Sequence, residues 1–98
     1  MRFDELKRRW RWQPIRNCPG RYILQDMPAA LTPLDLLGAE ARTAEFRVKG
    51  ARDIVVVARL EGGGLISYRR ADGSYLHTLN TEEGFERKLL DLGIEVSR

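Results

Sequence analysis

The chain of 98 residues has no long hydrophobic run, one cysteine and one histidine. Its longest apolar run, residues 54–58, is far shorter than the roughly 20 residues of a membrane-spanning helix. Residues 1–10 carry charges where a secretory signal peptide would have its apolar centre. Cys18 cannot form an internal disulfide, whereas small secreted domains usually carry an even set of cysteines. These absences predict a cytoplasmic protein that does not associate with a membrane.

The small number of cysteine and histidine residues also limits the metal sites that the chain can form. Structural zinc sites use four ligands, and Cys18 and His77 fall short of that number. The glycines at 62–64 are not followed by the Lys-Ser/Thr of a phosphate-binding P-loop, and the Leu-Ile-Ser that follows them is typical of a strand. We therefore interpret residues 61–64 as a hairpin turn and expect neither a metal nor a cofactor.

The composition is that of a globular chain, with 43% hydrophobic and 32% charged residues. No internal repeat, low-complexity stretch or Pro/Gly/Ser-rich linker divides it. We expect one domain that spans residues 1–98.

Helical patterns occur near both ends of the chain and once between them. Phe3, Leu6 and Trp10 fall on one helical face, and Pro14 prevents further helix. Residues 32–38 resemble a capped short helix, with Thr-Pro at its start and glycine at its end. The last helix is expected to begin with Asn80 as its cap and to end at Gly93.

Strand patterns occupy most of the remaining chain. Alternating or β-branched residues predict strands at 21–25, 44–48, 53–60, 65–69 and 75–79, and residues 94–96 as a short edge strand or packed tail. The run at 54–58 is apolar on both faces, which is typical of a central strand covered on both sides. We predict an α+β fold: a mostly antiparallel meander sheet of four to five strands, with the C-terminal helix packed on one face and a short N-terminal helix.

Positive charge is concentrated at one end of the chain. Residues 1–21 carry seven cations and two anions, a net charge of +5, whereas the other 77 residues carry a net charge of −2. A localised basic segment is a candidate docking surface for an acidic protein face, phosphate or nucleic acid.

Aromatic residues are interleaved with these cations. The candidate binding residues are Arg8, Arg9, Trp10, Arg11, Trp12, Arg16, Arg21 and Tyr22. They favour a non-enzymatic binding module that engages a protein or another macromolecule. Single-stranded nucleic acid is the specific alternative, because cations neutralise phosphates and aromatic rings stack on bases. In the competing interpretation, the tryptophans anchor the N-terminal helix to the core and the arginines are solvated.

An enzymatic function is the remaining alternative. Cys18 lies between Arg16 and Arg21 in sequence and could act as a nucleophile, with His77 as its base. No family signature or orienting third residue accompanies this pair, so an idle or half-buried thiol is the simpler interpretation. Asp72-Gly73 between the strands predicted at 65–69 and 75–79 indicates a second hairpin turn. The adjacent cations Arg69 and Arg70 beside it point to opposite faces of a strand, so they do not line one anion site unless a bulge intervenes.

Overall fold

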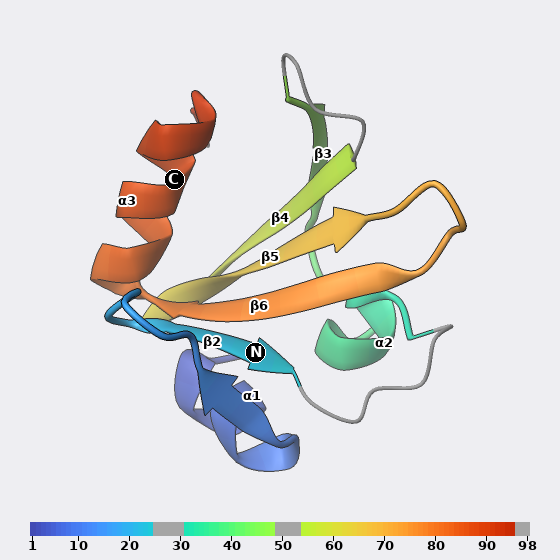
Figure 1. Ribbon diagram of the computed structural model, residues 1–98. Coiled ribbons are helices and arrows are strands. Elements are labelled where there is room, and N and C mark those ends of the chain that lie inside the picture. The colour runs from blue at the N-terminus through green and yellow to red at the C-terminus, as the bar shows by residue number, and fades with distance from the viewer. Residues whose placement is uncertain (25–30, 49–53, 96–98) are drawn as a thin grey trace.

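The computed structural model describes residues 1–24, 31–48 and 54–95, which form an antiparallel sheet flanked by helices (Figure 1). The elements in chain order are α1 (Phe3–Arg9), β1 (Trp12–Pro14), β2 (Arg21–Leu24), α2 (Pro33–Leu37), β3 (Ala44–Arg47), β4 (Ile54–Leu60), β5 (Gly63–Arg69), β6 (Tyr75–Thr81) and α3 (Glu82–Leu92). The predicted α+β class, the antiparallel sheet and both terminal helices are confirmed. Gln25, Asp53 and Val96, to which predicted strands extended, lie outside the described residues.

Within the described ranges the sheet has six strands in the order β1-β2-β6-β5-β4-β3, rather than the predicted four to five. The strands β3 to β6 form a meander, and β2 lies beside β6, far from it in sequence. The unpredicted strand is β1, which pairs with β2 through Trp12 and Leu24. Three residues are too few to show an alternating pattern, and Pro14 is tolerated because β1 is an edge strand.

The sheet separates two hydrophobic clusters. One lies under α3 and contains Val55, Val57, Ile66, Phe85, Leu89 and Ile94. The other lies on the side of α1 and α2 and contains Leu6, Leu24, Leu36, Leu37, Ala58, Leu60, Leu65 and Leu79. Successive residues of β4 therefore face different clusters, which confirms that this strand is covered on both sides. Ile94 belongs to the packed tail rather than to a strand.

The helix α3 begins one residue later than the sequence suggested. Its cap is Thr81, whose hydroxyl accepts a hydrogen bond from the Gly84 backbone N–H at 3.2 Å. Asn80 is fully buried in β6, where its side chain bonds across the sheet. Asparagine suits both an N-cap and a buried hydrogen-bonding position, and the strand pairing of Asn80 with Arg21 decides between them.

The glycines Gly63 and Gly64 are part of β5, not of the predicted turn. Gly63 pairs with Leu60, so the hairpin turn consists of Glu61 and Gly62 alone. Gly64 packs under the ring of Phe85, where any Cβ atom would overlap the ring. Close approach of α3, rather than turn formation, therefore requires glycine at this position.

The start of α2 matches its prediction. The Thr32 hydroxyl accepts from the Asp35 N–H at 3.2 Å, and the Thr32 N–H donates to the Asp35 carboxylate at 2.8 Å. This reciprocal pair is a capping box. The carboxylate is exposed, and its hydrogen bonds to Thr32 hold the pKa of Asp35 below its ordinary value.

Candidate functional site

The aromatic members of the predicted binding segment are packed against the protein. Trp10, Trp12 and Tyr22 are partly buried against the cluster on the α1 side of the sheet. The indole Nε1–H of Trp12 donates to the carbonyl oxygen of Leu6 at 2.9 Å, which ties β1 to α1. The Lys7 ammonium lies 4.6 Å from the centroid of the Tyr22 ring. These contacts support the interpretation of the tryptophans as anchors of α1 and β1.

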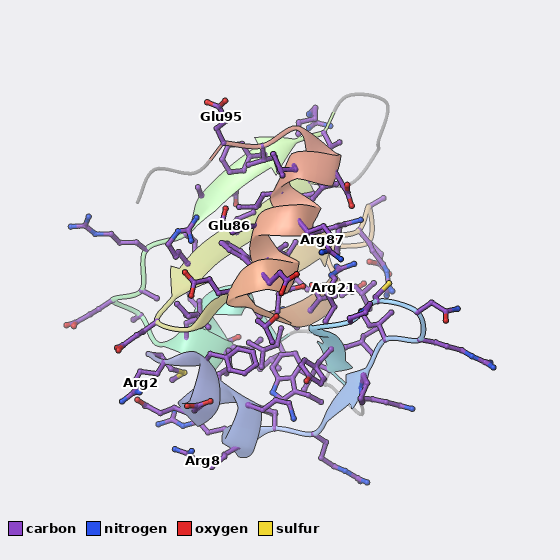
Figure 2. The ribbon with its side chains drawn as sticks, turned by 90° about the vertical axis from the view of Figure 1, so that its left-hand side faces the viewer. Arg2, Arg8, Arg21, Glu86, Arg87 and Glu95 are labelled. Atoms are coloured by element: carbon purple, nitrogen blue, oxygen red, sulfur yellow. The ribbon has the colours of Figure 1, made fainter. Side chains whose placement is uncertain are left out.

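The arginines of the same segment behave differently. Arg8, Arg9, Arg11 and Arg16 are exposed, and we call them the N-terminal basic surface. Figure 2 shows Arg8 on α1, at the end of the molecule away from the last turns of α3. The segment thus combines aromatic rings packed against the core with exposed arginine residues.

Arg21 is the exception, because it is half-buried on the α3 side of the sheet. Its Nε–H donates to the Asn80 side-chain oxygen at 2.7 Å. Asn80 is itself fixed, since its amide nitrogen donates to the carbonyl of Thr78 at 3.1 Å and to that of Gly64 at 3.3 Å. Burial raises the pKa of Tyr68 above its ordinary value, and the charge and hydrogen bond of Arg21 oppose that effect. The hydrogen bond to the buried Asn80 holds the Arg21 side chain against β6.

A cavity of about 190 Å³ lies between this arginine, the loop before β2 and α3. We call it the α3 pocket; its lining residues are Asn17, Cys18, Pro19, Arg21, Gly84, Arg87, Lys88 and Asp91. Figure 2 shows Arg21 and Arg87 close to each other where the loop meets the helix. Cations outnumber carboxylates in this lining, so the pocket is electropositive.

The loop that forms one wall is held tightly against α3. The Thr81 N–H donates to the Gly20 carbonyl at 2.8 Å. A Cβ atom on Gly84 would lie 2.7 Å from that carbonyl oxygen, so Gly20 of the loop packs directly against Gly84 of the helix. Gly20 has φ of 77° and Asn17 has φ of 62°, in the left-handed region that non-glycine residues seldom adopt. The backbone conformation of this wall is thus specified by Asn17, Gly20 and the contact with α3.

The structure does not bring Cys18 and His77 together. Cys18 lines the pocket beside α3, whereas His77 is fully buried on the other side of the sheet. Both ring nitrogens of His77 have other partners: Nδ1 lies 2.7 Å from the Ser67 hydroxyl, and Nε2 lies 2.9 Å from the Leu31 carbonyl oxygen. Burial lowers the pKa of His77, which keeps the ring neutral. These contacts explain His77 as a structural residue and exclude it as the base for Cys18.

Sequence reasoning missed the α3 side of the pocket. Arg21 is among the candidate residues, but Arg87 and Lys88 belong to the last helix, for which the sequence predicted no binding role. Nothing local connects positions so far apart in the chain. The residue that leads to the pocket is Asn80. Its polar side chain is buried in β6 and therefore needs a hydrogen-bond partner, which lies on the neighbouring strand.

No group of His, Cys, Asp and Glu side chains able to hold a metal ion occurs among the residues that the structure describes. Likewise, none of the described helices is long and apolar enough to cross a membrane. Comparison of the chain with protein-family models, curated proteins and solved structures gave no significant match.

Proposed function

We propose that this chain is a non-enzymatic binding module whose N-terminal basic surface engages an acidic face of a partner protein. The observation that carries the proposal is that the aromatic and the charged side chains of residues 8–16 lie in different environments. The two tryptophans pack on the core, while Arg8, Arg9, Arg11 and Arg16 are exposed. Because the backbone is already ordered, only the arginine side chains lose conformational freedom when they form bidentate pairs with carboxylates.

Charge distribution supports this choice of partner. The segment of residues 1–21 has a net charge of +5 on a chain whose remainder is mildly acidic. An acidic partner would therefore be attracted to this end and weakly repelled by the rest of the molecule. Such steering is screened within about 8–10 Å at physiological salt, so binding should weaken as ionic strength rises.

Charge reversal tests the proposal. The variant carries Arg8→Glu, Arg9→Glu and Arg11→Glu together, and its control carries Arg42→Glu, Arg47→Glu and Arg70→Glu, which are exposed cations of β3 and of loops. Both variants change the net charge equally. Binding of a fluorescent polyglutamate peptide is followed by anisotropy at several salt concentrations. We expect the first variant to lose at least tenfold in affinity and the control to stay within about threefold.

Equal losses in the two variants would show that only net charge matters and would overturn the proposal. Circular dichroism and urea unfolding check that both variants fold. Arg8 and Arg9 stand in the last turn of α1, where the reversed charge is expected to cost about 0.3–1 kcal/mol in stability.

Nucleic acid is the second candidate, since the same arginines could neutralise phosphates. Its support is weaker because the rings of Trp10 and Trp12 pack on the core, which limits their stacking on bases. Titration with labelled single-stranded and duplex oligonucleotides distinguishes the two partners. Tighter binding to an oligonucleotide than to polyglutamate, with a log–log salt slope of several units, would replace the acidic protein as partner.

A further inference from the structure

We propose that the α3 pocket is a binding site for a phosphate-type oxyanion, either inorganic phosphate or the phosphate group of a small monoester. This site is separate from the N-terminal basic surface, because none of Arg8, Arg9, Arg11 and Arg16 lines it. It combines a fixed guanidinium at the base with two further cations contributed by the helix.

Arg21 supplies the fixed cation. Its Nε–H is bound to Asn80 at 2.7 Å, and Asn80 is buried with its own amide group hydrogen-bonded to strand carbonyls. An arginine oriented in this way can present its terminal N–H groups to an anion with little further loss of rotamer freedom. Preorganised donors of this kind are typical of oxyanion sites rather than of solvated surfaces.

The helix supplies the other two cations. Arg87 and Lys88 project from the same side of α3 into the pocket lining, together with the carboxylate Asp91. Arg87 also lies 3.1 Å from Glu83, but the side chains of that ion pair are 63% and 82% exposed. Exposed pairs of this spacing contribute little to stability, so a dianion in the pocket can displace Glu83 from Arg87.

The size and walls of the pocket restrict the ligand. About 190 Å³ is smaller than the usual 300–1,000 Å³ of a drug-sized pocket, so it accommodates a compact group. Pro19 and the Cys18 side chain form an uncharged wall, and the loop is fixed to α3 through Gly20 and Gly84. Cations that converge from a strand and a helix match the several oxygens of a tetrahedral dianion better than the single plane of a carboxylate.

The test is a titration of the full chain with inorganic phosphate, followed by amide chemical shifts, with sodium chloride adjusted to keep ionic strength constant. We expect saturable shifts in residues 17–21 and 84–91, with a Kd on the order of 1 mM or tighter. A parallel titration with glycerol 3-phosphate identifies the source of the anion. Tighter binding of the ester supports a small phosphate monoester, and equal binding supports inorganic phosphate. Shifts that never saturate, or that chloride reproduces, would exclude the site.

Variants of Glu83, Arg87 and Lys88, none of which is buried, keep this test independent of folding. Arg87→Gln and Lys88→Gln should each weaken phosphate binding about fivefold or more, because each removes a cation from the pocket. Glu83→Gln should strengthen it about twofold, since Arg87 loses its competing carboxylate. Arg42→Gln, a cation outside the pocket, is the matched control and should leave the Kd unchanged. Unchanged binding in both Arg87→Gln and Lys88→Gln would overturn the proposal.

The charge-reversal variant of the N-terminal basic surface separates the two proposals. With Arg8, Arg9 and Arg11 changed to Glu, saturable binding of phosphate should remain within about threefold, because those side chains do not line the pocket. A loss of phosphate binding as large as the loss of polyglutamate binding would show that one basic surface, and not a distinct pocket, is responsible.

Discussion

Ser67 and His77 are direct cross-strand partners in β5 and β6, and the Ser67 hydroxyl lies 2.7 Å from His77 Nδ1. The other ring nitrogen, Nε2, lies 2.9 Å from the carbonyl oxygen of Leu31. A carbonyl oxygen only accepts, so Nε2 carries the proton of the neutral ring and Nδ1 accepts from Ser67. The pair thus connects the sheet to the segment that leads into α2 with every ring nitrogen satisfied.

Removal of the Ser67 hydroxyl should destabilise the protein. Ser67→Ala leaves the buried Nδ1 of His77 without its donor, which is expected to cost about 1–3 kcal/mol. Urea unfolding measures this loss, and Thr43→Ala, which removes an exposed hydroxyl, is the control expected to stay within about 0.5 kcal/mol. A loss for Ser67→Ala no larger than the control would show that this hydrogen bond makes no net contribution to stability.

Stability should also fall as the solution becomes mildly acidic. Burial lowers the pKa of His77 in the folded state, although the Leu31 carbonyl and the Asp35 carboxylate oppose this effect. As pH decreases below about 6.5, the unfolded chain binds a proton that the folded chain excludes, so the free energy of unfolding decreases until the folded pKa is passed. His77 is the only histidine. Urea midpoints at pH 7.5 and 5.5 should therefore differ, and the imidazole resonance should titrate below 6.5; titration at or above that value would refute the assignment.

Gly64→Ala should be strongly destabilising although alanine is acceptable in a strand. The added methyl group would overlap the Phe85 ring, which is itself fully buried. Overpacking of this kind costs about 1–3 kcal/mol or more. Urea unfolding of Gly64→Ala, Phe85→Leu and the double variant forms a cycle. We expect the double variant to be less destabilised than the sum of the single changes, and strict additivity would show that the two residues do not compete for space.

Trp12→Phe should loosen the attachment of β1 to α1. The indole N–H donates to the Leu6 carbonyl, which lies in the last turn of α1, where carbonyl groups lack helical partners. Its loss is expected to cost about 1 kcal/mol beyond the change in packing. The comparison is Trp10→Phe, which also trims a partly buried indole. If the two variants unfold at the same urea concentration, the Trp12 hydrogen bond makes no net contribution.

The two ion pairs of α3 should differ in strength. Arg59 Nη1 lies 2.7 Å from the Glu86 carboxylate, and the guanidinium lies 5.1 Å from the centroid of the Phe85 ring. Arg59 Nε is buried without a hydrogen-bond partner among the described residues, so the side chain depends on Glu86. Glu86→Gln should cost about 1 kcal/mol, and Glu83→Gln, in the exposed pair with Arg87, at most about 0.5 kcal/mol. Thermal or urea unfolding decides the order, and a larger effect at Glu83 would contradict it.

The sequence alone was sufficient to predict the elements whose residue patterns are contained within a few neighbouring positions. The capping box of Thr32 and Asp35 and the alternation at 44–48 were visible because each depends on neighbours along the chain. The Asp72-Gly73 hairpin is of the same kind: the Asp72 carboxylate accepts from the Ser74 N–H at 2.9 Å. The continuous apolar run of β4 also predicted that both faces of the sheet are covered.

The same sequence could not reveal contacts between distant segments. The cap of α3 was misplaced because Asn80 pairs with Arg21 in a neighbouring strand. Gly63 and Gly64 lie in β5 rather than in the predicted turn, and the residues packed against them are distant in sequence: Phe3 and Asn80 at Gly63, and Phe85 at Gly64. Among the described strands, β1 pairs with β2 alone.

For the candidate sites, sequence alone determined that the positive charge lies in residues 1–21 and that aromatic rings accompany it. Only the tertiary structure decided that the tryptophans face the core, that the arginines of residues 8–16 remain in solvent, and that Arg21 instead joins Arg87 and Lys88 around a cavity. The physical reason is that charge and apolarity belong to single residues, whereas burial and convergence depend on which distant segments the sheet places side by side.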